Sequence, residues 1–365
     1  MPAHFETLRQ SRKNKTAVPA SSRPLLQTSR RSPSGNFRIH FDTTGSNTPA
    51  LLTETGNRIP GTYSQFVDSA AAIFDMVYKK EVQEFQFPAP PSDAGRGDGG
   101  EYDIYIIEYG SQLIFGETVP ESDYPISPQK TNTQYPTYIQ IDNDFGSGYR
   151  TMGMLALRAT AAHEYFHAIQ VGNYGLWEDD SYFYELTAEA MENTVFREAK
   201  DYLFDLKTYY SHISSIPLFT NANNSLSRGY ERAIFGIFLM KKFGVQAMRE
   251  VWNAVALERP VAAVQTALNN LSTTIEREYV DFSLWNFYTG DRTVFQTKYF
   301  DDAEEFSPLA MTERALTAST VQIASTLQAF ATSYVKVFTG SDSAYIILSN
   351  INYGDVKKYL NNVYG

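Results

Sequence analysis

The first half of the chain carries a mixture of strand and helix patterns. Residues 36–42 alternate between apolar and polar positions, as a strand with one buried face does, and 102–108 and 135–141 are also predicted to be strands. Residues 63–80 place apolar side chains on one face at helical steps, which predicts an amphipathic helix. A loop rich in Pro, Gly and Asp covers 88–100.

A longer helix is predicted over residues 152–170. The stretch contains no proline and consists mostly of good helix formers. Apolar side chains recur in it at three- and four-residue steps, as in a helix packed into a core: Leu155, Ala159, Ala162, Phe166 and Ile169. Gly172 and Gly175 are expected to end this helix.

The rest of the chain is predicted to be mainly helical and then to change to strands. A second helical run covers 182–193, and helices continue to about residue 285. Three later segments are predicted strands of a C-terminal β module, namely 321–323, 334–338 and 345–348.

Composition narrows the class of protein. Apolar residues fill 43% of the 365 positions, and a chain of this length can form one domain with a large core and a second, smaller domain. The formal charge of −10 comes without a basic stripe and disfavours nucleic acid as a partner. No run of 18 apolar residues occurs, so no membrane span is predicted. Because the chain has no cysteine, any bound metal ion must be held by histidine and carboxylate side chains.

The first 35 residues differ in composition from the rest of the chain. They contain seven Lys or Arg residues against a single acid, Glu6, together with many Ser, Thr and Pro residues. No apolar run comes after these charges, so the segment is not a secretory signal. We expect a flexible basic lead over residues 1–35.

The strongest chemical signal lies inside the predicted helix, where residues 163–167 read His-Glu-Tyr-Phe-His. Residues four apart share one helix face, so His163 and His167 can reach one metal ion together. Glu164 lies about 100° around the helix, where it can take a proton from a zinc-bound water. The motif therefore predicts one zinc ion, with Glu164 as the general base.

A catalytic zinc site needs a third protein ligand and one open position. Glu185 follows His167 by 18 positions, which leaves room for a loop and the start of a facing antiparallel helix. Glu189 lies one turn further on and is expected to accept a hydrogen bond from the outer N–H of His163 or His167. Glu189 and Glu192 remain alternatives to Glu185 as the ligand.

The setting of Glu185, in the segment Glu185-Leu-Thr-Ala188, resembles that of the third ligand in gluzincin metallopeptidases. Over residues 30–295 the chain most resembles the MXAN_6640 family of secreted bacterial metalloproteases. Five segments carry this likeness: 37–45, 102–106, 160–170, 185–192 and 282–291.

The resemblance implies a fold and a domain order. The fold is an α+β, zincin-like one, with a small mixed N-terminal sheet, an active-site helix and a mainly helical second half. The catalytic domain is expected over 36–300. The strand patterns after it, not the resemblance, predict a C-terminal β-rich segment over 301–365, which we expect the chain end to truncate. Gluzincins bind substrate backbone along a sheet edge, and we expect residues 138–141 near that edge.

The resemblance also extends to Tyr230. The segment 228–239 looks like the helix start of aminopeptidase-type gluzincins, in which a tyrosine faces the metal. This implies that Tyr230 helps to stabilise the oxyanion, with Tyr209 and Tyr210 as alternatives.

We therefore predict a zinc-dependent peptidase that acts on protein or peptide substrates. An endopeptidase is favoured, because no Gly-x-Met-Glu-Asn element of aminopeptidases precedes the site. The family implies a secreted or cell-surface bacterial protein whose signal peptide is absent from this chain. The alternative is a non-catalytic zinc-containing binding or adhesion module.

Calcium is a weaker possibility. Carboxylates cluster at residues 142–148 and among Asp93, Asp98, Glu101 and Asp103, but neither set matches a calcium-binding loop. We predict a turn at 142–148 in preference to a calcium site.

Overall fold

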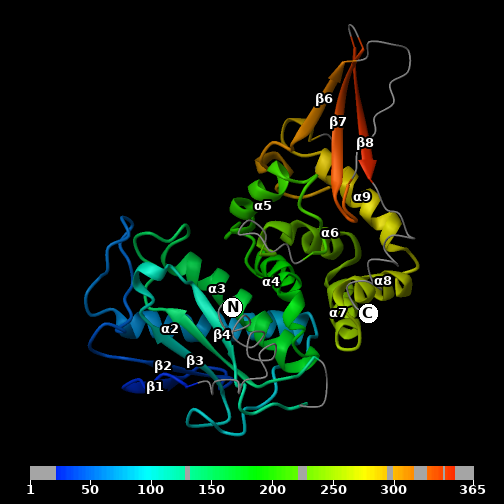
Figure 1. Cartoon of the computed structure of the whole chain (residues 1–365). Helices are drawn as coiled ribbons and strands as arrows, with labels where there is room; N and C mark the ends of the chain where they lie inside the picture. The colour runs from blue at the N-terminus through cyan, green and yellow to red at the C-terminus, as the bar shows by residue number, and fades with distance from the viewer. Residues whose placement is uncertain are drawn as a thin grey trace.

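The N-terminal half of the protein is built around a five-stranded mixed sheet (Figure 1). The computed structural model describes residues 22–127, 132–220, 228–293, 299–315, 327–339 and 342–349. The strands lie in the order β1-β2-β3-β5-β4. Their bounds are β1 Thr28–Arg31, β2 Phe37–Phe41, β3 Tyr102–Ile107, β4 Gly116–Pro120 and β5 Thr137–Asp142. Strands β2, β3 and β5 are parallel, whereas β1 and β4 are antiparallel to their neighbours.

Residues 138–141, expected near the sheet edge, lie one strand in from it and pair with the outermost described strand on that side. They belong to β5, which lies between β3 and β4, and Tyr138, Ile139 and Ile141 are buried. The outermost described strand on this side is β4, which the sequence did not predict. Its five residues, Gly-Glu-Thr-Val-Pro, are all buried and show no apolar alternation, so nothing in them indicated a strand.

The expected flexible lead also needs correction. Residues 1–21 lie outside the described residues, but 22–35 belong to the sheet domain, because strand β1 pairs with β2. Arg23 forms ion pairs with Asp93 (2.6 Å), Glu121 (3.0 Å) and Asp103, all of them buried. Three carboxylates around one guanidinium hold this segment against the sheet. The domain boundary expected at residue 36 is therefore too late.

Helices α2 (Tyr63–Tyr78) and α3 (Gly153–Ile169) contact the sheet and each other. Phe37 of β2 packs against Phe74 of α2 and Tyr165 of α3, with ring centroids 5.5 and 5.3 Å apart. All residues from Ala159 to Ile169 are buried, so α3 runs through the core as predicted. It continues into a π-helical turn (Gln170–Tyr174) and stops at Gly175, which has a φ of 83°.

The second half is helical, as expected, and carries a three-stranded sheet (Figure 1). The helices are α4 Ser181–Val195, α5 Tyr202–Ser211, α6 Ala233–Phe243, α7 Val245–Val255, α8 Pro260–Asn270 and α9 Ile275–Phe287. The strands are β6 Met311–Ala315, β7 Thr332–Thr339 and β8 Asp342–Ser349. Predicted strands 334–338 and 345–348 correspond to β7 and β8, whereas 321–323 lies outside the described residues.

The C-terminal sheet is packed onto the helices. Tyr334 of β7 donates a hydrogen bond to the backbone oxygen of Ser283 in α9 at 2.7 Å, and it belongs to the main hydrophobic core. The protein is thus an α+β fold with a mixed sheet. None of the helices in the described ranges combines the length and apolar character that a membrane crossing requires.

One buried carboxyl lies beside the core of the sheet domain. Glu81, in the π-helical turn Lys79–Glu84 that extends α2, is fully buried, and neither side-chain oxygen has a hydrogen-bond partner among the described residues. Burial raises the pKa of this carboxyl well above its ordinary value, while the charge of His163 opposes the shift.

Replacing Glu81 should change how stability depends on pH. Because folding raises the pKa of Glu81, the protein has its full stability below the pKa of the unfolded chain, about 4.3. Part of that stability is lost as the pH rises toward the pKa of the folded protein. We expect Glu81→Met to remove this loss. The difference in unfolding free energy between variant and wild type should grow by at least about 1.4 kcal/mol from pH 5 to pH 9. Urea denaturation at both pH values measures it.

Glu84→Gln is the matched control, because Glu84 lies in the same turn but is exposed and paired with Lys80. A difference for Glu81→Met that is the same at both pH values would contradict the assignment of a neutral buried carboxyl.

Candidate metal centre

Helices α3 and α4 bring three predicted ligands to one point. Nε2 of His163 and Nε2 of His167 lie 3.0 Å apart, and Oε2 of Glu185 lies 3.2 Å from each of them. All three side chains are buried, with 7%, 0% and 2% of their surface exposed. The two histidines share one face of α3, and Glu185 projects from the facing helix, as the sequence predicted.

The tautomer of His167 is determined by the hydrogen bond of its outer nitrogen, Nδ1, which faces away from the three converging donor atoms. Nδ1 lies 2.6 Å from Oε1 of Gln170. The Gln170 amide is oriented by its own donor bonds to the Tyr184 backbone oxygen and to Oγ1 of Thr187. Its oxygen must therefore accept from His167, which places the proton on Nδ1 and leaves a lone pair on Nε2.

His163 has a similar arrangement with carboxylates. Its Nδ1 lies 3.5 Å from Oε2 of Glu189 and 3.6 Å from Oε2 of Glu192. Glu189 thus lies beside the outer nitrogen of His163, where the sequence analysis placed it, and Glu192 lies there too. The carboxylate of Glu189 only accepts, so in the neutral ring the proton of His163 lies on Nδ1 and the Nε2 lone pair faces His167.

Three lone pairs consequently converge in a buried space. Such an arrangement is repulsive unless a proton or cation lies between the donor atoms. Burial alone would lower the pKa of His163, but hydrogen bonds to Glu185, Glu189 and Glu192 raise it well above its usual value. Burial also opposes ionisation of Glu185, yet the two histidines lower its pKa far below normal. The site favours positive charge at its centre.

The donor set fits zinc. Tetrahedral zinc with bonds of about 2.0–2.1 Å to nitrogen and oxygen separates its ligand atoms by about 3.3 Å, close to the distances found here. A second possible group, formed by His163, Glu189 and Glu192, uses the outer nitrogen of His163. There, burial and then the charge of Glu189 raise the pKa of Glu192 to about 8, so Glu192 is a poor anionic ligand at neutral pH.

Glu164 lies next to strand β4. The hydroxyl of Thr118 lies 2.7 Å from Oε2 of Glu164 and also 2.7 Å from its backbone oxygen. A Cβ on Gly116 would press against Thr160 and the Glu164 side chain, so strand and helix approach this closely only because that residue is glycine. Thr118 therefore fixes the carboxylate beside the candidate metal ligands.

Tyr230 also faces the site. It begins the 3-10 turn Tyr230–Arg232 before α6, and its ring stacks on His163 with centroids 5.7 Å apart. Burial and then the charges of Glu185 and Glu164 raise the pKa of its hydroxyl well above the ordinary value, so the hydroxyl stays protonated. The alternatives Tyr209 and Tyr210 are fully buried in the core and do not line the cavity.

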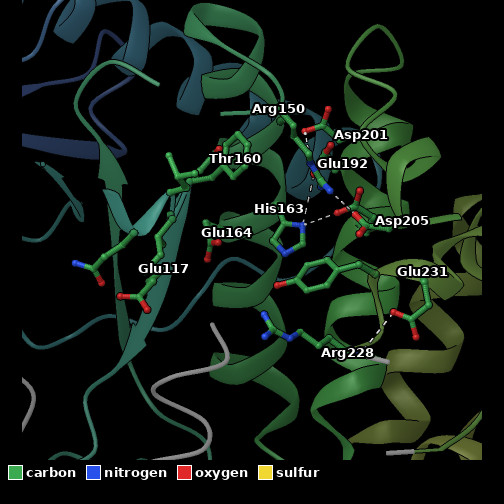
Figure 2. Close-up of a pocket in the computed structure, with 18 of the residues that line it drawn as sticks. Glu117, Arg150, Thr160, His163, Glu164, Glu192, Asp201, Asp205, Arg228 and Glu231 are labelled. Atoms are coloured by element: carbon green, nitrogen blue, oxygen red, sulfur yellow. Dashed lines mark hydrogen bonds and ion pairs between the residues drawn. The ribbon is translucent and has the colours of Figure 1, made fainter. Parts of the chain in front are cut away.

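A cavity of about 600 Å³ opens beside these residues (Figure 2). One wall is β4 and the segment before it, and the other comes from α4, α5 and the turn before α6. His163, Glu164 and Tyr230 line this cavity, so the candidate base and the candidate oxyanion donor face the same space as His163, a candidate metal ligand. The volume falls within the range of known ligand sites.

Four of the carboxylates considered for calcium have other partners, namely Asp93, Asp103, Asp142 and Asp144. Asp142 accepts hydrogen bonds from the backbone N–H groups of Asp144 and Phe145, and Asp144 forms an ion pair with Arg58. Asp93 and Asp103 pair with Arg23, as described above. Hydrogen bonds and arginines thus satisfy these side chains.

Three contributors to the site were not predicted in their roles. Gln170 and Thr118 hold His167 and Glu164, and Glu192 supports His163 together with Glu189. Gln170 lies three residues after His167, so its position on the same helix offered a signal. Thr118 is far away in sequence and offered none.

Comparison with protein-family models and with curated proteins gives no match for this chain.

Substitutions should separate the two possible ligand sets. We expect Glu185→Gln to weaken zinc binding at least 100-fold, whereas Glu189→Gln, which alters only a supporting contact, should weaken it about 10- to 100-fold. Competition against a chromophoric chelator measures both. Exposed Glu198, paired with Arg158 on the surface, provides the control Glu198→Gln. Wild-type affinity in Glu185→Gln would exclude the ligand set His163, His167 and Glu185.

Proposed function

We propose that the protein is a zinc-dependent peptidase of the gluzincin class with a zincin-like fold. The observation that carries the proposal is the convergence of two Nε2 lone pairs and one carboxylate oxygen within 3.2 Å of one another, beside a buried glutamate in an open cavity. A purely structural metal site needs no carboxylate placed as a base. Glu164, held by Thr118, therefore favours catalysis over the alternative of a binding module.

Each residue has a defined task in the proposed reaction. His163, His167 and Glu185 would hold the zinc ion. When bound, zinc acts as a Lewis acid and lowers the pKa of a water in its open position to about 7. Glu164 takes a proton from the attacking water at its carboxylate and returns it to the leaving amine nitrogen. The protonated hydroxyl of Tyr230 donates to the carbonyl oxygen as negative charge develops there.

We propose peptides as substrates because of the walls of the cavity. Strand β4, the outermost described strand on its side of the sheet, lines the cavity next to Glu164. A peptide in extended form alongside β4 would pass the base with its backbone. The absence of an aminopeptidase-type Gly-x-Met-Glu-Asn sequence before the site favours an endopeptidase.

Glu164→Gln tests the assignment of the base. The change removes the proton acceptor but keeps the shape and leaves the ligands intact. We expect unchanged zinc content and a loss of at least about 1,000-fold in kcat for a quenched-fluorescence peptide or casein. Metal analysis and the assay, each with and without chelator, give the result. Zinc-loaded Glu164→Gln with wild-type turnover would refute the mechanism, whereas zinc-loaded wild type without turnover would favour the binding module.

Tyr230→Phe tests the oxyanion donor. Loss of one such donor is expected to lower kcat about 100-fold while KM changes little, because the bond forms mainly in the transition state. Tyr209→Phe is the control, since the Tyr209 hydroxyl is buried away from the cavity. Equal effects of the two variants would show that Tyr230 has no special part in the reaction.

A further inference from the structure

Most charged side chains on the cavity wall already have partners. Arg150 pairs with Asp205 at 2.6 Å and lies 3.8 Å from Asp201. Glu231 accepts hydrogen bonds from the backbone N–H of Gly229 and from Nε of Arg232. The carboxylates behind His163 are shared with its ring, as described above. These groups hold one another and have little capacity left for a ligand.

Arg228 is different. It lines the same cavity as His163, Glu164 and Tyr230, and it is exposed. Within the described ranges, no carboxylate forms an ion pair with its guanidinium, and only its backbone N–H bonds to Glu231. The neighbouring segment 221–227, Asn-Ala-Asn-Asn-Ser-Leu-Ser, contains no acidic residue that could serve. Figure 2 shows the side chain pointing away from Glu231 toward the side of the cavity where Glu164 lies.

The backbone under Arg228 is held in place. Gly229 has a φ of 119°, and a Cβ there would collide with the Tyr182 backbone oxygen and press on Glu185 of α4. Oε2 of Glu231 closes the turn by accepting from the N–H groups of both Arg228 and Gly229. Arg228 and Tyr230 therefore flank a residue that is fixed against the metal-ligand helix.

We propose that Arg228 is a specificity-determining residue that binds a carboxylate of the peptide substrate, an inference that rests on the proposed peptidase function. A guanidinium pairs with a carboxylate through two parallel hydrogen bonds, and it stays charged at every working pH. The carboxylate belongs either to an Asp or Glu side chain near the cleaved bond or to the C-terminus of a short peptide. Either source places one negative charge at a fixed distance from the base Glu164.

A panel of internally quenched peptides tests the proposal with the zinc-loaded full chain. In one arm, a single Asp moves along an otherwise neutral sequence and is compared with Asn at each position. In the other arm, a free C-terminus is compared with its amide. We expect at least a tenfold higher kcat/KM for the charged member of a pair at one position or at the C-terminus, which identifies the source.

Variants then assign the preference to one side chain. Arg228→Gln should reduce the charged-to-neutral ratio to within twofold of one and leave hydrolysis of the neutral peptide within threefold of wild type, and Arg228→Glu should favour Lys at the same position. Arg158→Gln, which alters an exposed arginine paired with Glu198, should keep the preference. If wild type shows no such preference, or if Arg228→Gln leaves the charged-to-neutral ratio unchanged, the role of Arg228 is overturned but the proposed peptidase function is not. No hydrolysis of any peptide by the zinc-loaded wild type overturns it together with the proposed function.

Discussion

The architecture of the site depends on one electrostatic constraint, which is that three lone pairs point at a common buried centre. The outer nitrogens of both histidines are committed to acceptors, Gln170 for His167 and the Glu189–Glu192 pair for His163. When both rings are neutral, their inner nitrogens face each other and Glu185 as lone pairs. Only positive charge at the centre makes this arrangement stable in a buried space. The supporting contacts thus favour a cation at this centre as much as the three candidate ligands do.

The fold satisfies this constraint with two buried helices and two glycines. Helix α3 supplies both histidines and the candidate base, and α4 supplies the third candidate donor and the carboxylate beside the outer nitrogen of His163. Gly116 lets strand β4 approach α3 closely enough for Thr118 to hold Glu164. Gly229 brings the turn that carries Arg228 and Tyr230 against α4. The same close approaches that build the candidate metal centre also form the walls of the cavity beside it.

Local patterns predicted the parts of this structure that depend on neighbours in sequence. The helical steps of residues 152–170 and the spacing of His163, Glu164 and His167 predicted a buried helix with one chemical face, and α3 has both. Strand β4 and the anchoring of residues 22–35 depend on distant partners. Thr118 meets Glu164 across 46 positions and Arg23 meets Asp93 across 70, so no pattern within either segment could indicate these contacts.

Anomalous diffraction at the zinc edge, from crystals of the full chain grown with zinc, tests the central claim most directly. The account predicts one strong peak within about 2.0–2.2 Å of Nε2 of His163, Nε2 of His167 and a carboxylate oxygen of Glu185. Gln170 and Glu189 would contact only the outer nitrogens of the two histidine rings and not the zinc ion. A peak on the other side of His163, between Glu189 and Glu192, or no peak in this region, would contradict the account.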